Sequence, residues 1–234
     1  MTHDLKNINR ARPIKSFVIR ASRITNAQKL AIEKYWKLHV LEFTKTPIDL
    51  SHTFKGQSPL IVEVGFGMGD SLLAMAKNQP DKNFIGIETH KPGVGKLLHG
   101  IISEKLENLK IFCHDAREVL NFSIGKNTVS KLLIFFPDPW HKKKHNKRRL
   151  IQTDFIGSIL PILKEGGCIH LATDWHPYAE HMMDVLESTD GTFNLMGPRK
   201  FSLNPDRPPT KFEKRGKLLG HSIYDLVFTK KTGT

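Results

Sequence analysis

The sequence predicts an α/β fold with a mostly parallel, doubly wound sheet. Between residues 60 and 186, short apolar runs alternate with segments of helical periodicity, which is typical of parallel strands joined by crossover helices. A glycine turn, Gly65-Phe66-Gly67-Met68-Gly69, separates the first apolar run from the first helical segment. Residues 132–136 are consecutive apolar residues followed by Pro137, so they predict a short buried strand that ends there.

The region before the first apolar run predicts one amphipathic helix and a linker. Residues 25–28 have the S/T-x-x-E/Q form of a capping box, and apolar residues then recur at helical spacing as far as Leu41. Residues 47–59 are rich in Thr, Ser and Gly, which is typical of a linker. We therefore divide the chain into a basic N-terminal arm with its helix, residues 1–55, and a main domain, residues 56–234.

The main domain begins with a Rossmann-like unit and continues through repeated strand and helix signals. Strands are expected at residues 60–64, 83–88, 109–115, 129–136 and 168–174, and helices at residues 70–77, 92–101, 150–163 and 177–186. After residue 191 the pattern loosens to a strand near Phe193, a Pro-rich basic loop over residues 198–220, and a last strand at residues 222–229. A loop of that length in a compact domain is usually functional or disordered.

Composition favours a soluble intracellular protein with a polyanionic partner. Lys and Arg number 36 against 23 Asp and Glu, a formal charge of +13. No apolar run approaches the roughly 20 residues that cross a bilayer, so no membrane partner is expected. Two cysteines, Cys113 and Cys168, do not make a disulfide framework, and a reducing cytoplasm fits best.

The strand at residues 132–136 leads directly into a dense basic run. Six of the nine residues 141–149 are Lys or Arg. Such a run can be a solvated surface, but in a parallel sheet the region just beyond a strand's carboxyl end borders the ligand crevice, and a cluster this dense is typical of phosphate binding. We therefore expect a nucleic acid. The basic residues 1–23 then suggest an arm that joins RNA binding, although an organelle transit segment remains an alternative.

Acidic residues near the glycine turn indicate the type of cofactor. The turn alone suits NAD as well as S-adenosylmethionine, but its spacing is G-x-G-x-G rather than G-x-G-x-x-G. Asp70 stands at the helix amino terminus, where a dinucleotide fold holds pyrophosphate, and Glu63 interrupts the first strand. We expect these acids to repel pyrophosphate and to favour a ligand with an ammonium and a sulfonium group. A nicotinamide-dependent oxidoreductase is the alternative.

Two further acids follow successive strands. Glu88 ends the second strand about 20 residues beyond the glycines, where a carboxylate accepts hydrogen bonds from ribose hydroxyls. Asp115 ends the third strand in His-Asp-Ala, where it can accept from an adenine amino group. Each acid alone is equally explained as a helix N-cap. Their repetition at strand ends favours a cofactor pocket.

Together these motifs resemble those of bacterial tRNA (guanine-N7)-methyltransferases. The matching segments are E-V-G-F-G-M-G-D, G-I-E, H-D-A, F-P-D-P-W-H-K-K-K-H-N-K-R-R, A-T-D-W and T-K-F-E, and the likeness runs from about residue 60 to the C-terminus, so it does not cover the basic arm. It implies a Rossmann-like class I methyltransferase fold with an antiparallel C-terminal strand, S-adenosylmethionine as the methyl donor, and N7 of a variable-loop guanine of tRNA, conventionally numbered 46, as the acceptor.

The resemblance also implies roles for individual residues. The donor site would comprise Glu63, Glu88, Asp115 and Asp138, together with Gly65 and Gly67 of the turn. Substrate-binding residues would be Lys142, Asp174, Thr210, Lys211, Phe212 and Glu213. RNA-contacting residues would be Lys144, His145, Asn146, Lys147, Arg148 and Arg149.

The chemistry of the acceptor agrees with this set. Guanine N7 has an in-plane lone pair and no proton, so alignment with the methyl group matters more than a general base. Asp138 is our candidate for stabilising the cationic purine that forms. Asp174 and Glu213 are candidates for accepting from N1–H and the 2-amino group of guanine, although either acid alone is also explained as a salt-bridge partner.

Three aromatic and histidine side chains in or next to the basic run each have two interpretations. Trp140 either stacks on an extruded base or packs against the protein. His141 and His145 have i, i+4 metal spacing, but the surrounding lysines oppose a cation, so no metal is expected. A catalytically silent RNA-binding protein is a further alternative, and the protein is either a monomer or a homodimer.

Overall fold

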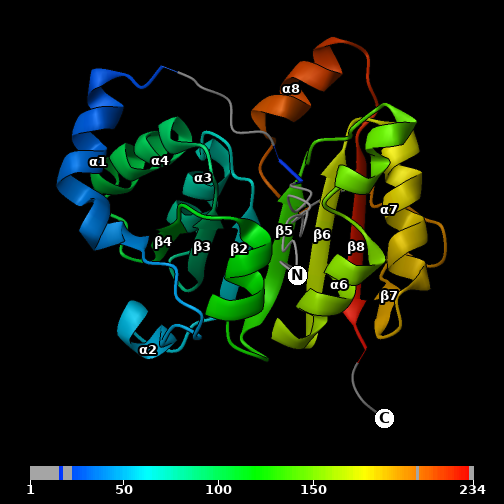
Figure 1. The fold of residues 1–234 in the computed structure, drawn as a ribbon, viewed down its shortest axis with the longest axis horizontal. Coiled ribbons are helices and arrows are strands. Elements are labelled where there is room, and N and C mark those ends of the chain that lie inside the picture. The colour runs from blue at the N-terminus through cyan, green and yellow to red at the C-terminus, as the bar shows by residue number, and fades with distance from the viewer. Residues whose placement is uncertain (1–15, 18–22, 204–205, 232–234) are drawn as a thin grey trace, which may run out of the picture.

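A computed structural model of the 234-residue chain describes residues 16–17, 23–203 and 206–231. One eight-stranded sheet forms its centre, with the strand order β1-β4-β3-β2-β5-β6-β8-β7 (Figure 1). The strands are β1 Val40–Leu41, β2 Leu60–Val64, β3 Asn83–Ile87, β4 Leu109–Phe112, β5 Val129–Phe135, β6 Leu163–Thr173, β7 Thr192–Asn194 and β8 Tyr224–Lys230.

Strands β1 to β6 are paired in parallel, and β8 is antiparallel to both β6 and β7. The prediction of a mostly parallel sheet with an antiparallel C-terminal strand is therefore confirmed. Strand order reverses between β2 and β5, because β3 and β4 lie on one side of β2 while β5 and β6 lie on the other. A crevice at the carboxyl ends of the strands forms at such a reversal.

The helices cover both faces of the sheet, as Figure 1 shows. The α-helices are α1 Asn26–His39, α2 Leu50–Thr53, α3 Asp70–Asn78, α4 Lys91–Ser103, α5 Ala116–Glu118, α6 Thr153–Ile159, α7 His176–Ser188 and α8 Lys211–Leu218; short helices of other types are η1 Val119–Ser123, η2 Lys143–Arg148 and η3 Leu160–Ile162. None of the helices in the described part of the chain is long and apolar enough to cross a membrane.

Alternation along the strands divides the core into two layers. Val62 and Val64 of β2 pack with the side chains of α6 and α7, whereas Ile61 packs with those of α1, α3 and α4. The capping box predicted for α1 is present, because the Thr25 hydroxyl accepts from the Gln28 N–H and the Gln28 side chain accepts from the Thr25 N–H. Since side chains alternate, Glu63 belongs to the second layer, with Ile61.

Three segments differ from the sequence-based expectations. The expected loop over residues 198–220 contains α8, which Thr210 caps by accepting from the N–H of Glu213. The strand expected from residue 168 begins earlier, at the start of β6, and the preceding helix is correspondingly short. Residues 40–41, placed by sequence in the region before the main domain, pair with β4 at the edge of the same sheet.

Candidate cofactor and substrate site

A cavity of about 530 Å³ lies at the carboxyl ends of the central strands. Its lining includes predicted donor-site residues from four separate strand ends: Gly65, Gly67, Glu88, Asp115 and Asp138. The structure thus brings together residues from segments that are far apart in the sequence. A volume of this size is typical of small-molecule and cofactor sites.

The glycine turn shapes one wall of the cavity. Gly67 has a φ of +59°, a conformation that residues with a side chain rarely adopt. The carbonyl oxygen of Gly67 also lies so close to α4 that a Cβ atom on Gly93 would stand 1.9 Å from it. Both positions therefore need glycine, and the turn is fixed against the start of α4.

Glu88 fastens this turn to the end of β3. Its Oε2 accepts from the N–H of Gly67 at 2.9 Å, and its Oε1 accepts from the N–H groups of Thr89 at 2.7 Å and His90 at 3.0 Å. The Thr89 hydroxyl also donates to Oε1, at 3.4 Å. Oε2 accepts from Gly67, and its second lone pair can accept from a ligand hydroxyl. Glu88 both organises the turn and faces the cavity.

Glu63 is buried behind the cavity rather than in its lining. Glu63 is only 3% exposed, and its Oε2 has no hydrogen-bond partner among the described residues. Burial, and then the negative charge of Glu88, raise the pKa of Glu63 to about 8, with Arg207 opposing the shift. At neutral pH the carboxyl therefore holds a proton, so the expected repulsion of pyrophosphate by a Glu63 charge is not supported by its surroundings.

Asp70 also differs from its expected role. It is the first residue of α3, as expected, but its exposed side chain forms an ion pair with Lys96, and Asp70 is not among the lining residues. Because Lys96 neutralises this charge, Asp70 gives little electrostatic selection against a pyrophosphate.

Asp115 combines the two interpretations that the sequence left open. It caps α5 by accepting from the N–H of Arg117 at 2.9 Å, and it lines the cavity as well. Capping uses one of its oxygens, so the other remains for a ligand donor.

The loop that holds Asp138 has an unusual backbone and a buried support. Phe136 and Trp140, on either side of Asp138, have φ values of +51° and +47°, which are uncommon for residues other than glycine and often occur at functional sites. The Nε of Arg149 donates to the carbonyl of Pro139 at 3.0 Å. Asp138 itself is exposed at the cavity edge.

Arg149 therefore differs from the basic residues that precede it. It is 5% exposed, and its guanidinium lies over the rings of Trp175 and Tyr178, at 5.4 and 5.0 Å from their centroids. The prediction that Arg149 contacts RNA does not fit this burial, because a phosphate has no access to its guanidinium. Arg149 instead supports the Asp138 loop.

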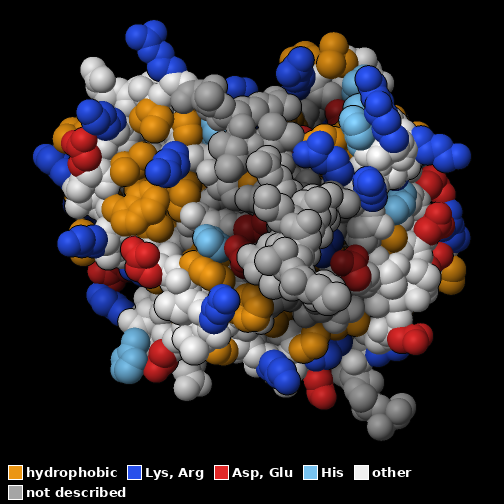
Figure 2. Space-filling view, in the orientation of Figure 1, with side chains coloured by type: hydrophobic (Ala, Val, Ile, Leu, Met, Phe, Trp, Pro, Cys, Tyr) orange, Lys and Arg blue, Asp and Glu red, His pale blue; other side chains and the backbone are white. Residues whose placement is uncertain are grey.

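Other residues of the basic run face outward to different degrees. Lys142, Lys144 and Lys147 are exposed, whereas His145, Asn146 and Arg148 are half-buried. Arg148 lies over the ring of Trp140 at 3.9 Å, and the Trp140 Nε1–H donates to the carbonyl of Ser16. One face of Trp140 is thus covered by protein, and stacking of its other face on a base stays a prediction. Figure 2 shows Lys, Arg and His side chains gathered near α8 on this side of the molecule.

Of the predicted substrate residues, Phe212 lies at the cavity itself. Phe212 is 60% exposed and has its ring centroid 6.2 Å from that of Phe136 at an interplanar angle of 21°. Asp174, at the end of β6, is half-buried and has its Oδ2 3.4 Å from Nδ1 of His221. Glu213 is buried and forms ion pairs with Arg207 and Lys217. Glu213 is thus a salt-bridge partner, as one of the two interpretations predicted, and its recognition of guanine stays a prediction.

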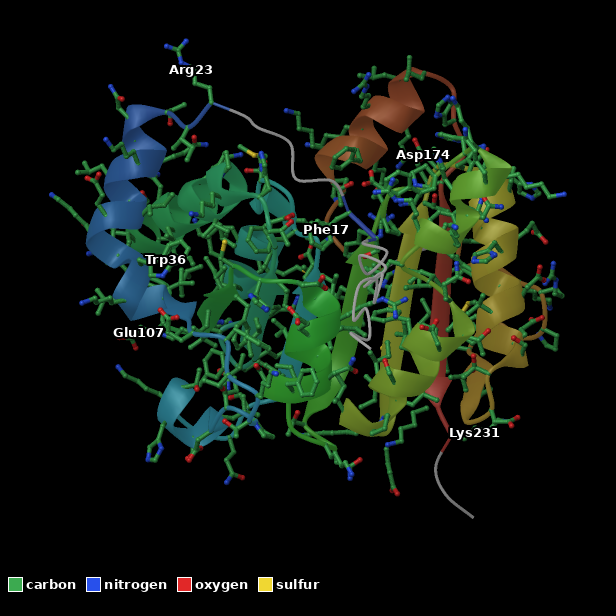
Figure 3. All side chains as sticks on the ribbon, viewed as in Figure 1. Phe17, Arg23, Trp36, Glu107, Asp174 and Lys231 are labelled. Atoms are coloured by element: carbon green, nitrogen blue, oxygen red, sulfur yellow. The ribbon has the colours of Figure 1, made fainter. Side chains whose placement is uncertain are left out.

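Several residues of the site were not predicted from the sequence, and three of them matter for its geometry. Ser16 and Phe17 line the cavity although they lie in the basic arm, and Figure 3 places Phe17 near the carboxyl end of β5. Arg207, in the Pro-rich segment, is buried near Glu63. The apolar Phe17 among basic residues was an available signal, whereas nothing local distinguished Arg207. Among the residues that the structure describes, no cluster of three or more His, Cys, Asp or Glu is arranged for a metal ion.

Comparison with known proteins is consistent with this geometry. Residues 57–226 match the family described as "Putative methyltransferase". The tRNA (guanine-N(7)-)-methyltransferase of Salmonella typhimurium strain LT2 is 49% identical over 220 residues, covering 94% of this chain and 92% of that protein. The Yersinia pestis protein of the same name is 48% identical over 221 residues, with the same coverage.

Solved structures show the same fold at low sequence identity. The 16S rRNA methyltransferase KamB matches with a TM-score of 0.60 and 13% identity, over 83% of this chain and 99% of that one. The aminoglycoside resistance methyltransferase NpmB1 matches with a TM-score of 0.56 and 16% identity, over 80% and 95% of the two chains. Both are Rossmann-like, and at this identity they inform the fold alone.

Proposed function

The chain belongs to the family of tRNA (guanine-N(7)-)-methyltransferases, and we propose that it transfers the methyl group of S-adenosylmethionine to N7 of guanine 46 in the variable loop of tRNA. One observation supports this proposal above the others. Glu88, Asp115 and Asp138 line a single cavity, and the exposed lysines of the basic run follow Asp138 directly in the chain. A donor pocket and a surface for an anionic polymer therefore adjoin.

The residues around the cavity fit S-adenosylmethionine. Glu88 and Asp115 keep free lone pairs for the ribose hydroxyls and the adenine amino group, and the buried Oε2 of Glu63 lacks a partner. A cationic group in the cavity would favour the ionised form of Glu63 through its charge. When bound, the cofactor supplies an electrophilic methyl group on its sulfonium.

The protein's contribution to the transfer is alignment and charge. Guanine N7 needs no general base, so a rigid placement of the base beside the donor is the main requirement. Arg149 holds the Asp138 loop through Pro139. Asp138, exposed at the cavity edge, supplies a fixed negative charge where the purine becomes cationic.

Transfer RNA as the substrate explains the basic character of the surface. Lys142, Lys144 and Lys147 are exposed and follow the cavity residue Asp138 within nine positions of the chain. Phosphate contacts by such residues provide a large share of the affinity for a nucleic acid. The two described cysteines are free thiols. A cytoplasmic location, where tRNA is modified and thiols stay reduced, belongs to the same proposal.

The proposal is tested by incubating the protein with labelled S-adenosylmethionine and bulk tRNA, followed by nucleoside analysis. The expected product is 7-methylguanosine, and a transcript with adenosine at position 46 should accept no label. Label in a different nucleoside, or undiminished label in the adenosine transcript, would refute the assignment. NAD in a thermal-shift assay serves as the control ligand and should not stabilise the protein.

A further inference from the structure

Arg207 is the centre of a buried ionic network that lies outside the donor pocket. Its side chain is 1% exposed. Its Nε and Nη2 donate to the two carboxylate oxygens of Asp225 at 2.7 and 2.8 Å, and its Nη1 donates to Glu213. The other oxygen of Glu213 accepts from Lys217 at 2.6 Å, and His170 contacts Asp225 at 2.7 Å.

This network joins the sheet to the segment that contains the predicted substrate residues. Asp225 is on β8 and pairs in register with Ala172 of β6. Glu213 is in the first turn of α8, one residue after Phe212 of the cavity. Arg207 therefore links the end of the sheet to the helix that holds Phe212 at the cavity.

The remaining surroundings of Arg207 also belong to the site. Its guanidinium carbon lies 5.1 Å from the ring centroid of Phe135 and 5.8 Å from that of Phe136. Phe136 faces the ring of Phe212, and both line the cavity. The same guanidinium thus contacts the fixed wall of the cavity and, through Glu213, the wall supplied by α8.

The position of α8 matters for a second predicted substrate residue. A Cβ atom on Gly216 of α8 would lie 3.2 Å from Oδ2 of Asp174, so the helix backbone packs directly against that carboxylate. A shift of α8 would therefore change the surroundings of Phe212 and Asp174 together.

Stability alone is a weak explanation for such a network. Replacing a buried ion pair by apolar residues is often neutral or stabilising, because desolvation offsets the attraction between the charges. What a bidentate arginine does provide is a fixed geometry. Although burial opposes ionisation, hydrogen bonds from His170 and Arg207 hold the pKa of Asp225 below its usual value. The anchor on β8 thus stays charged at neutral pH.

We propose that Arg207 is a positioning residue that fixes α8 on the end of the sheet and thereby sets the place of the substrate base between Phe212 and Asp174. Its effect on methyl transfer rests on the proposed function, whereas its effect on α8 does not. Arg207 acts through Glu213 and Asp225 and is not itself a catalytic residue.

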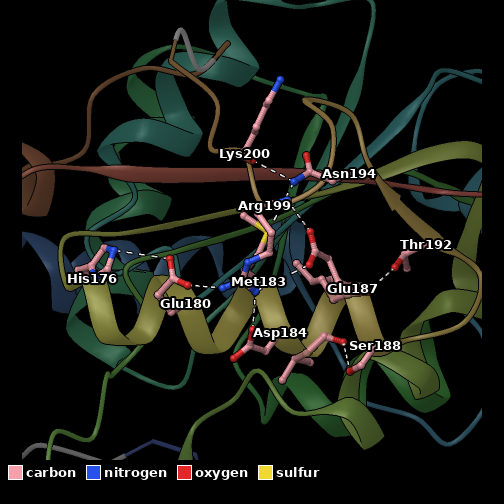
Figure 4. Close-up of polar contacts among 12 residues, drawn as sticks. His176, Glu180, Met183, Asp184, Glu187, Ser188, Thr192, Asn194, Arg199 and Lys200 are labelled. Carbon is pink, nitrogen blue, oxygen red and sulfur yellow. Dashed lines mark hydrogen bonds and ion pairs between the residues drawn. The ribbon is translucent and has the colours of Figure 1, made fainter.

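A matched control is available on the far side of the C-terminal region. Arg199 also binds several carboxylates, those of Glu180, Asp184 and Glu187 on α7 (Figure 4). Its side chain is 48% exposed, its ion pairs are with α7, and it is not among the residues that line the cavity. Arg199→Met therefore removes a comparable arginine cluster without loosening the substrate segment.

The first measurement is amide hydrogen exchange of the full-length protein without ligands. Arg207→Met should lose protection across residues 211–218 while the strands β2 to β5 keep theirs, and Arg199→Met should leave α8 as in the wild type. Unchanged protection of α8 in Arg207→Met, or an even loss across the whole domain, would overturn the proposal. This measurement tests whether Arg207 holds α8 in place, and it does so even if the protein methylates no tRNA.

The second measurement separates position from charge. Arg207→Lys keeps a positive charge near Glu63 but lacks the fork that binds Asp225 and Glu213 together. Arg207→Lys should bind S-adenosylmethionine as the wild type does, yet methylate tRNA more slowly. For Arg207→Met, kcat/KM for tRNA should fall about 100-fold, which is the loss expected when a substrate is misplaced by about 1 Å. Wild-type turnover in Arg207→Lys together with wild-type exchange of α8 would refute positioning, and this variant keeps the test open if Arg207→Met does not fold.

Discussion

Replacing Glu63 by glutamine should stabilise the protein, and increasingly so as the pH rises. The unfolded chain releases the Glu63 proton near pH 4.5, whereas the folded protein holds it up to about pH 8. Since the native state binds more protons over this interval, the free energy of unfolding of the wild type falls as pH increases. Each unit of pKa corresponds to about 1.4 kcal/mol, so the full cost of burying this carboxyl approaches about 5 kcal/mol above pH 8.

Glutamine has nearly the same shape and does not titrate, so the variant lacks this loss. The difference in unfolding free energy between Glu63→Gln and the wild type should be small at pH 4.5 and should grow by about 1.4 kcal/mol per pH unit until about pH 8. With a urea slope of about 2 kcal/mol per molar, the midpoints should separate by about 2 M at pH 8. Glu107→Gln, at an exposed ion pair with Lys55, is the control and should show no such growth.

The same substitution should have the opposite effect on the cofactor. A ligand with an ammonium and a sulfonium group is stabilised by an ionised Glu63, which glutamine cannot provide. We therefore expect weaker S-adenosylmethionine binding in the more stable variant, measured by calorimetry at pH 8. A stability difference that stays constant between pH 5 and 8 would show that Glu63 titrates normally and would refute the reasoning.

Three further results are expected. Asp138→Ala should reduce methyl transfer by at least about 100-fold, the scale of a lost electrostatic group, while tRNA retention on filters persists; wild-type turnover would remove Asp138 from the mechanism. Neutralising Lys144 and Lys147 should lower the slope of log K for tRNA binding against log salt concentration by about 0.7 to 0.9 for each phosphate that the protein no longer neutralises. Arg149→Met should not change this slope but should make turnover slower. A reduced slope for Arg149→Met would contradict the burial of Arg149. Asp174→Asn should lower the ratio of the methylation rate with guanosine at the target position to the rate with inosine there. An unchanged ratio would mean that Asp174 does not recognise the base.

The central strands were predictable because their signals are local. The strand expected at residues 60–64 coincides with β2, since a β-branched run between a proline and a glycine turn has few alternative structures. Strand β5 ends at Phe135, just before Pro137, as the missing N–H of proline requires. Parallel strands present their carboxyl ends at one edge of a sheet. The predicted strand ends were therefore enough to predict that Glu88, Asp115 and Asp138 lie close together, and all three line the cavity.

Helix α8 was missed although its cap was visible. Thr210 and Glu213 have the spacing of a capping box, and Thr210 does cap the helix. Several prolines, a glycine and a dense charge pattern outweighed this signal. Glu213 and Gly216 of this helix are buried, the first against Arg207 and the second against Asp174. Such tertiary packing cannot be inferred from a short polar segment.

The charge state of the site was not predictable from sequence for a related reason. A glutamate in a strand was expected to be a carboxylate, but burial of Glu63 beside Glu88 keeps it protonated in the free protein. That outcome depends on which groups surround the side chain, and these come from distant parts of the chain. Motif spacing fixes where acids stand along the sheet edge, whereas packing decides which of them are ionised.

The arginines and lysines of this basic chain serve different purposes. Arg149 and Arg207 are withdrawn from the surface and each holds one wall of the cavity, the first through the carbonyl of Pro139 and the second through Glu213. Residues such as Lys144 and Lys147 are exposed and are the ones we propose to contact the RNA backbone. A planar guanidinium can bind several acceptors in a fixed geometry and lie over aromatic rings, whereas an ammonium acts as a mobile point charge. Arg→Lys exchange should therefore be harmful at the two buried positions, whereas Lys→Arg exchange at Lys144 or Lys147 should be mild, although the formal charge is unchanged in every case.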